Sequence, residues 1–194
     1  RMISWPFGLY DCAAQSDGAA ALVLSRADLA RSFREDPVWI KAVAIALAPN
    51  PQTDPDFDFL AWKPTLYAAR QAYEQAGIDE PFKQIDIAQV HDCFTLTEML
   101  TYEDLGFCEK GSAKEHVASG TFALRGELPV NTDGGLKTFG HPTGATGVRM
   151  LYENTLQLQG RAEGRQVEGA TTALSHNIGG APQTCGMTVV GIDR

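Results

Sequence analysis

Residues 136–160, LKTFGHPTGATGVRMLYENTLQLQG, join a glycine-rich segment around one histidine to an amphipathic pattern. Apolar residues recur in its second half at the spacing of a helix that buries one face. The residues of that predicted face are Val148, Leu151, Tyr152, Thr155 and Leu158. Gly160 suits the position just after a helix C-terminus, so we expect a helix that ends near Gln159.

Strand patterns lie on both sides of this helix. Residues 38–47 and 85–92 precede it, and residues 169–176 and 184–192 follow it. A second helix is predicted at 64–76. Strands that are separated by helices of this length indicate an α/β fold with a mixed, mostly parallel sheet and helices on its faces. The last two strands are too close for a helical crossover and are expected to pair antiparallel.

The patterns are weaker in the N-terminal part and in the middle of the chain. Residues 1–16 are interpreted as an irregular arm, DGAAALVLS at 17–25 predicts a buried strand, and residues 26–33 predict a short helix. Residues 106–130 are predicted to be a mixed loop with weak helical tendency.

Composition argues against several classes of protein. The chain has 194 residues and a net charge of −8, which disfavours binding to duplex nucleic acid or to anionic membranes. No apolar run approaches the roughly 18 residues that span a bilayer. Four irregularly spaced cysteines indicate free thiols and a reducing, cytoplasmic setting. Because Met2 follows Arg1, we expect a fragment, a processed product or a tagged chain.

Three polar clusters are candidates for a site: HDCF at 91–94, GHP at 140–142 and SHNIGG at 175–180. Sites in α/β sheets gather beyond the ends of strands, where these clusters are expected. His91 and Cys93 could form a catalytic cluster, or they could belong to an ordinary strand-end turn. A metal pair is a weaker option, because H-x-C without further ligands is a poor zinc signature, and we predict no metal.

The sequence around His141 is more specific than the sequence around His91 and Cys93. Gly140 removes a side chain, so another group can approach the backbone, and Pro142 fixes the direction of the chain. The start of the following helix carries partial positive charge, which favours a neutral imidazole that can act as a base or as a hydrogen-bond donor. A satisfied histidine in a packing turn explains the pattern equally well. At Gly179 and Gly180, backbone N–H groups could bind an oxyanion, or the pair could simply link two strands.

The order of HDCF, then NTDGGLKTFGHPTGATG at 131–147, then HNIGG at 176–180 resembles the C-terminal half of thiolases. SDGAAALVLS at 16–25 and YEDLGFCEKG at 102–111 are similar to the sterol-carrier-protein-2 thiolase and lipid-transfer-protein branch of that superfamily. The resemblance implies a thiolase-like half with the element order βαβαβαββ. Two such halves stack in the layers α-β-α-β-α.

The resemblance also implies domain boundaries. It places residues 1–34 in the tail of the N-terminal half, as its last strand and a short helix, and residues 35–194 in the C-terminal domain. A half that is built to stack on its twin exposes a large apolar face when it is alone. The nucleophilic cysteine of the family would lie before Arg1, since Cys12 is not in the C-x-S context of that nucleophile.

By the same resemblance, the reaction is Claisen condensation or its reverse on acyl-CoA. Coenzyme A is then a substrate, and no cofactor is expected. His141 activates the nucleophilic cysteine and helps to form an oxyanion hole. His91 stands where many thiolases have the asparagine of N-E-A-F, which holds a catalytic water in that hole. Cys93 supplies the second acid/base, a task that suits the tunable pKa of a thiol.

The loop between the last two strands departs from the family pattern. Many thiolases have a C-x-G motif there, whereas this chain has Asn177 in place of the cysteine and Gly179 in place of the glycine. The N–H of that glycine contributes to the other oxyanion hole. The usual acid/base position is therefore unfilled. His176 is a second candidate for the role beside Cys93, and Cys185 is expected in the core.

Three functions follow from these interpretations. The leading one is the C-terminal portion of a thiolase-type acyl-CoA acyltransferase, completed by an N-terminal half or a partner subunit in a homo- or hetero-oligomer and inactive alone. The alternative is a retro-aldolase on sterol side-chain acyl-CoA. Relatives of that kind replace both motif histidines with tyrosines, so His91 and His141 favour Claisen chemistry. The third is a non-catalytic assembly subunit, against which the intact histidine pair argues.

Overall fold

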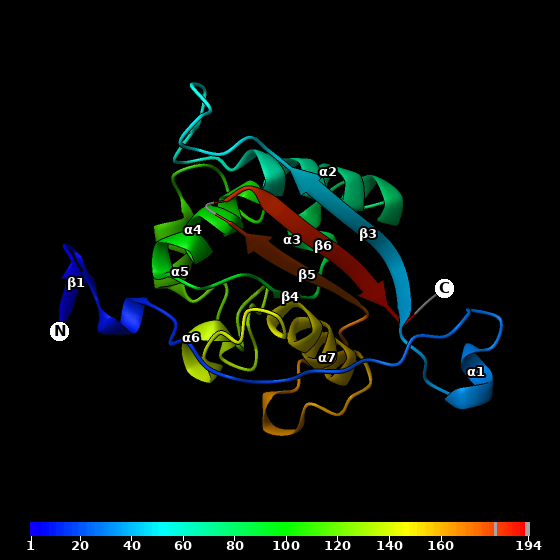
Figure 1. The fold of residues 1–194 in the computed structure, drawn as a ribbon. Helices are drawn as coiled ribbons and strands as arrows, with labels where there is room; N and C mark the ends of the chain where they lie inside the picture. The colour runs from blue at the N-terminus through cyan, green and yellow to red at the C-terminus, as the bar shows by residue number, and fades with distance from the viewer. Residues whose placement is uncertain (181, 193–194) are drawn as a thin grey trace.

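The main sheet of the computed structural model has four strands among the residues that it describes, 1–180 and 182–192 (Figure 1). From edge to edge these are β3 (Trp39–Leu47), β6 (Thr184–Gly191), β5 (Thr172–Gly179) and β4 (Ile87–Gln89). β6 is antiparallel to both of its neighbours, and β4 and β5 are parallel. β3, β4 and β5 therefore run in one direction and β6 alone reverses, which confirms the α/β class, the mixed sheet and the antiparallel closing pair. Because β6 lies between β3 and β5, only the pair of β4 and β5 is parallel, fewer parallel pairs than the sequence predicted.

β4 is shorter than the predicted strand at 85–92 because its continuation bonds to a side chain. The N–H of Val90 donates to Oδ1 of Asn131 at 2.9 Å. Two residues before Val90, Ala88 forms an isolated parallel bridge with Val130, which extends the edge of the sheet. The chain therefore leaves the sheet where HDCF begins.

Helices cover both faces of the sheet (Figure 1). α2 (Lys63–Ala76), close to the predicted helix, packs on β3 and β6, and a large apolar core beneath it includes Ala72 and Leu174. α7 (Thr146–Leu158) packs on β5 and β4 over a smaller core that includes Ala173. Among the described residues no helix is long and apolar enough to cross a bilayer. The shorter elements are β1 (Met2–Ser4), β2 (Phe7–Gly8), α1 (Ala30–Phe33), α3 (Pro81–Gln84), α4 (Thr95–Asp104), α5 (Ala113–Ser119), α6 (Gly135–Phe139) and the 3₁₀ turns Leu9–Asp11 and Glu163–Arg165.

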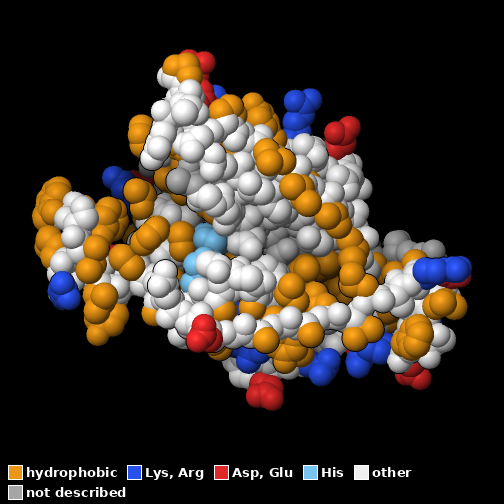
Figure 2. All heavy atoms as spheres, in the orientation of Figure 1, with side chains coloured by type: hydrophobic (Ala, Val, Ile, Leu, Met, Phe, Trp, Pro, Cys, Tyr) orange, Lys and Arg blue, Asp and Glu red, His pale blue; other side chains and the backbone are white. Residues whose placement is uncertain are grey.

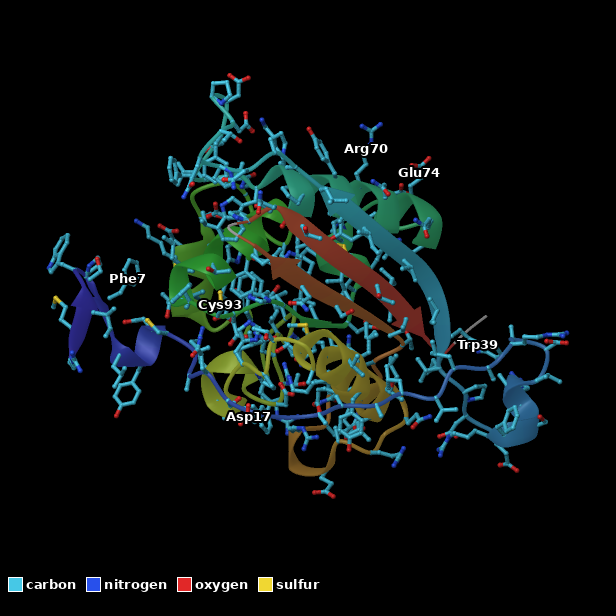
Figure 3. The ribbon with its side chains drawn as sticks, viewed as in Figure 1. Phe7, Asp17, Trp39, Arg70, Glu74 and Cys93 are labelled. Atoms are coloured by element: carbon cyan, nitrogen blue, oxygen red, sulfur yellow. The ribbon has the colours of Figure 1, made fainter. Side chains whose placement is uncertain are left out.

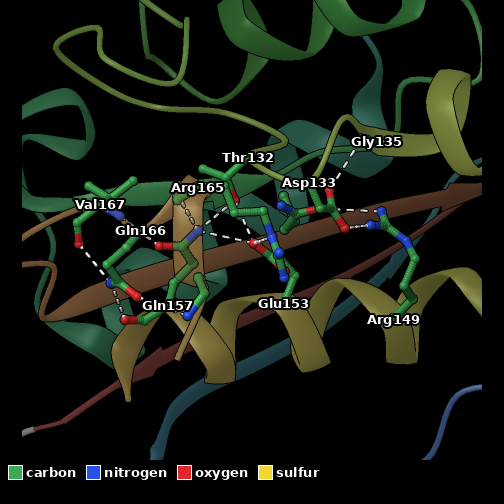
Figure 4. A network of polar contacts seen from close by, with 11 residues as sticks. Thr132, Asp133, Gly135, Arg149, Glu153, Gln157, Arg165, Gln166 and Val167 are labelled. Carbon is green, nitrogen blue, oxygen red and sulfur yellow. Dashed lines mark hydrogen bonds and ion pairs between the residues drawn. The ribbon is translucent and has the colours of Figure 1, made fainter. Parts of the chain in front are cut away.

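The buried face of α7 differs from the predicted one. Glu153, Asn154 and Gln157 are buried, whereas Tyr152, which was expected inside, is 50% exposed. The polar side chains can be buried because each finds a partner. Nδ2 of Asn154 donates to a backbone carbonyl of β5 at 2.9 Å, and Glu153 accepts hydrogen bonds from Arg165 and Gln157 (Figure 4). Apolar periodicity alone does not detect such a network.

The predicted strand at 17–25 does not form. Residues 13–26 adopt no regular secondary structure, and Val23 is 98% exposed. A strand needs a neighbour that satisfies its backbone, and no described strand pairs with this segment. The predicted helix at 26–33 is confined to its last turn, Ala30–Phe33. Residues 1–34, which the resemblance assigns to the tail of a preceding half, are therefore mainly chain without regular secondary structure.

One side of β3 is uncovered. Its side chains alternate between the core beneath α2 and the outside. The outward apolar side chains, each at least half exposed, are Ile40, Val43, Ile45 and Leu47. Figure 2 shows them as a row of apolar side chains along this strand. Such a face agrees with the apolar surface that is expected of a half that stacks on another.

Candidate active site

All three predicted clusters border one cavity of about 700 Å³. Its walls also include the N-terminal arm, which was not expected there. Figure 2 shows histidine side chains in the middle of a hollow on this face. The lining residues are Ala13, Gln15, His91, Cys93, Phe94, His141, Thr143, Asn177, Ile178, Gly179, Gly180, Thr184 and Gly186.

His91 and His141 are direct neighbours. Their ring centroids are 4.9 Å apart and the rings meet edge to face, at 86°. His91 follows β4, and His141 lies between α6 and α7. The two imidazoles are 50 positions apart in the sequence, and the fold brings them into contact.

His91 is held by Asn177 of β5. Nδ1 of His91 and Oδ1 of Asn177 are 2.5 Å apart, and an amide oxygen can only accept, so Nδ1 carries the proton. His91 is 5% exposed, and this burial lowers its pKa to about 4, with a smaller contribution from the nearby His141. The hydrogen bond to Asn177 opposes the shift. His91 is therefore neutral at pH 7.

His141 is held from two sides. Its Nδ1 lies 2.7 Å from Oγ1 of Thr146, the first residue of α7, and its backbone N–H donates to the carbonyl of Ala14 at 2.7 Å. Burial lowers the pKa of His141, so this ring too is in its neutral form near pH 7. The direction of this shift agrees with the neutral histidine that the sequence predicted, and burial is its cause.

The arm passes directly over Gly140. This glycine has φ +83°, and a Cβ there would lie 2.5 Å from Oγ of Ser16. The prediction that Gly140 admits another group is therefore correct, and the group is the chain's own N-terminal arm. The same arm donates from the N–H of Ala13 to the carbonyl of Cys93 at 2.8 Å. It thus connects the HDCF segment to the GHP segment.

Asp92 joins the HDCF segment to α6, the helix before GHP, and sequence patterns did not single it out. Its side chain is buried, and Oδ1 accepts the N–H of Leu136 at 2.8 Å at the start of α6. Gly135 has no Cβ because the carboxylate of Asp92 occupies that space. Burial raises the pKa of Asp92. The paired glycines of NTDGG were the available signal of a close approach.

Cys93, labelled in Figure 3, lies two residues before α4. Its side chain is partly buried and lines the cavity. Its Sγ is 3.8 Å from Oγ1 of Thr97. Burial is the main cause that raises the pKa of the Cys93 thiol, and the negative charge of Asp92 adds to it. The group is therefore a protonated thiol at neutral pH, which is the form that can give up a proton.

His176 does not fit the acid/base role that was considered for it. It is fully buried, it is not among the residues that line the cavity, and its Nε2 lies 3.1 Å from Oγ1 of Thr65. The next three residues of β5, Asn177, Ile178 and Gly179, line the cavity instead. Burial lowers the pKa of His176 to about 3. Cys185 is buried in the core, as predicted.

No group of three or more His, Cys, Asp or Glu residues is arranged to hold a metal ion within the described part of the chain. The polar groups around the cavity include two neutral imidazoles, one thiol and the backbone around Gly179 and Gly180, beside uncharged amide and hydroxyl side chains. This set can accept a proton, donate a proton and bind an oxyanion. It has no permanent charge of its own at neutral pH.

Comparisons with known proteins agree with this geometry. Residues 51–192 match the family described as "Thiolase C-terminal domain-like". The chain is 42% identical over 188 residues to an acetyl-CoA acetyltransferase of Methanothermobacter thermautotrophicus, covering 97% of this chain and 48% of that protein. It is 37% identical over 179 residues to sterol carrier protein 2 of Homo sapiens, covering 88% and 32%. The chain thus spans about half, or less, of the length of these relatives.

Among solved structures, the fold is similar to a chain of an "Ltp2-ChsH2(DUF35) aldolase". The TM-score is 0.82 at 24% identity, and the match covers all of this chain and 50% of the other. At this identity the likeness establishes the fold alone.

Proposed function

This chain belongs to the thiolase C-terminal domain-like family, and on that premise we propose that it is the C-terminal portion of a thiolase-type acyl-CoA acyltransferase. The reaction would be Claisen condensation, or the thiolytic cleavage of a 3-ketoacyl-CoA. The observation that carries the proposal is the contact of His91 with His141 at a cavity that Cys93 also lines. Coenzyme A would enter as a substrate, in free and acylated form.

His141 is proposed as the base. A neutral imidazole at the cavity wall can take the proton of a thiol and so generate the thiolate that attacks the substrate carbonyl. The lowered pKa of His141 keeps it in the accepting form near pH 7. Once protonated, the same ring can stabilise the oxyanion that develops on the attacked carbonyl.

Cys93 is proposed as the acid. Cleavage of the carbon–carbon bond of a 3-ketoacyl-CoA leaves a carbanion on acetyl-CoA, which needs one proton. The thiol of Cys93 is protonated at neutral pH because burial raises its pKa. The backbone N–H groups near Gly179 border the cavity and are then available for oxygen atoms of the substrate, whereas the one N–H of neutral His91 is donated to Asn177.

The nucleophilic thiol is proposed to come from outside these 194 residues, from an N-terminal half or a partner chain. Of the four cysteines, Cys93 has been assigned as the acid, Cys108 and Cys185 do not line the cavity, and Cys12 lies in the arm beside it. The uncovered face of β3 supports a further layer of protein there. The cytoplasmic setting and the oligomeric state stay predictions.

Aldol cleavage is the competing proposal, and the two histidines favour Claisen chemistry over it. Thiolysis consumes free coenzyme A, whereas a retro-aldol cleavage does not. Acetoacetyl-CoA cleavage should therefore be measured with and without coenzyme A, on the chain alone and with the N-terminal half supplied. We expect activity only with both coenzyme A and the second half present. Cleavage that proceeds equally well without coenzyme A would contradict the thiolase assignment.

A His141→Ala variant tests the role of the base. Removal of a general base costs about 10²- to 10⁴-fold in kcat. The matched control is His116→Ala, because His116 lies on α5 and does not line the cavity. Turnover of His141→Ala that equals the control would support the assembly subunit instead.

A further inference from the structure

Thr146 is buried at the first turn of α7 and does not line the cavity, yet it contacts the ring that does. It is 1% exposed, and its Oγ1 lies 2.7 Å from Nδ1 of His141. The same Oγ1 lies 3.2 Å from the carbonyl oxygen of Pro142, four residues earlier. A threonine hydroxyl in a helix commonly donates to the carbonyl of residue i−4.

The number of protons decides the direction of these contacts. A hydroxyl has one proton, and a carbonyl oxygen has none to offer. When the hydroxyl of Thr146 donates to Pro142, its contact with His141 must be N–H to O, with the ring as the donor. A neutral imidazole has a single N–H, so Nε2 is left with a free lone pair.

We propose that Thr146 is a positioning residue that holds His141 in the Nδ1–H tautomer and so turns an unprotonated Nε2 toward the cavity. This deepens the proposed function, because a base must present an unprotonated nitrogen to the thiol. Free imidazole is not restricted to one tautomer, but only the tautomer whose unprotonated nitrogen faces the cavity can act as the base. The wrong tautomer costs about 10⁴-fold in another histidine-dependent enzyme.

The start of α7 does not depend on the hydroxyl, which makes the role testable. The carbonyl of Pro142 also accepts the N–H of Ala145 at 2.8 Å and that of Thr146 itself at 3.0 Å. Thr146→Val keeps the shape and the β-branch of the side chain and removes only the hydroxyl. Thr146→Ser keeps the hydroxyl and is the matched control.

The first test is the ¹⁵N NMR signature of the histidine rings in the 194-residue chain. We expect His141 to show a protonated Nδ1 and an unprotonated Nε2 in the native protein and in Thr146→Ser. In Thr146→Val the proton should shift toward Nε2, while the signals of His116 stay unchanged and show that the fold is kept. A native His141 that is protonated at Nε2, or a tautomer that Thr146→Val leaves unchanged, would overturn the proposal.

Kinetics of the complete enzyme, with the N-terminal half present, give the second test. Thr146→Val should lower kcat of acetoacetyl-CoA thiolysis by at least about tenfold with little change in KM, and Thr146→Ser should restore it. The base assignment of His141 and the positioning role of Thr146 can be refuted independently of each other. If His141→Ala stays active while the tautomer is as expected, the base assignment fails and the positioning role stands. If Nε2 carries the proton, the positioning role fails whatever the activity.

Discussion

The side-chain oxygen of Asn177 lies 2.5 Å from Nδ1 of His91. Asn177 can come this close because a glycine faces it: a Cβ on Gly147 would lie 3.0 Å from its Nδ2. Asn177 stands where the resemblance puts an acid/base cysteine in other thiolases. Its position here is that of a side chain that orients a histidine, which leaves the proton transfer to another group.

Asn177→Asp should raise the pKa of His91. A carboxylate next to the ring favours the imidazolium, by about 1 to 3 units, so the value of about 4 should move toward or above the ordinary histidine value. An NMR titration of the His91 ring measures this shift. Asn50→Asp, on the loop before α2, is the control and should leave the titration of His91 unaltered. A pKa that stays near 4 in Asn177→Asp contradicts the contact.

Gly140→Ala should destabilise the protein and release the arm. The backbone at φ +83° costs a side-chain-bearing residue about 1–3 kcal/mol, and the new methyl group would collide with Ser16. Urea unfolding measures the loss, and proteolysis of the arm reports its release. Gly144→Ala is the matched control, because nothing lies within 4 Å of a Cβ there. Equal stability of the two variants would contradict the close passage of the arm.

Stability should fall as the pH is lowered from about 6.5 to about 4. The pKa of His91 is about 4 in the folded chain against 6.5 for the ordinary group, so in this window the unfolded state binds a proton that the folded state does not. The contribution of His91 is complete above pH 6.5 and amounts to about 3 kcal/mol. Urea unfolding at several pH values measures the slope.

His91→Asn should flatten this slope, because asparagine does not titrate. His141 and His176 have lowered pKa values as well, so part of the slope should remain. The same pH dependence in His91→Asn and in the native chain would show that His91 is not buried in neutral form.

Cys93→Ala should abolish most of the activity of the completed enzyme. Loss of a general acid costs about 10²- to 10⁴-fold in kcat, and no other thiol of this chain takes its place at the wall beside His91 and His141. Cys108→Ala is the matched control, since Cys108 is also partly buried with a raised pKa but does not line the cavity. Rates of thiolysis under saturating substrate measure the effect. Similar rates in both variants would remove Cys93 from the reaction.

Helices and strands with a regular sequence pattern were predicted most reliably. β3 and α2 lie close to where alternation, β-branching and helix-end glycines placed them, because the signals for these elements are local. The segment at 17–25 has the composition of a strand but lacks a partner strand in this chain. Strand formation depends on that partner, which a single stretch of sequence does not reveal.

The site was predicted as a set of motifs but not as a set of contacts. HDCF, GHP and HNIGG do meet at one cavity. Asp92 and Thr146 escaped notice because their roles depend on hydrogen bonds to residues 44 and 5 positions away. His176 was a second acid/base candidate beside Cys93, yet the fold buries it completely, with its ring against Thr65 and outside the lining of the cavity.

The N-terminal arm also has a consequence for the order of events during folding. Its hydrogen bonds join Ala13 to Cys93 and Ala14 to His141, so they close very long loops of chain. Closing a long loop costs conformational entropy that later contacts must offset, whereas only four residues lie between β5 and β6 along the chain. The hairpin of β5 and β6 should therefore form early, and the alignment of His141 should be completed last. In native-state hydrogen exchange, the amide of His141 should open well before those at the centre of β6.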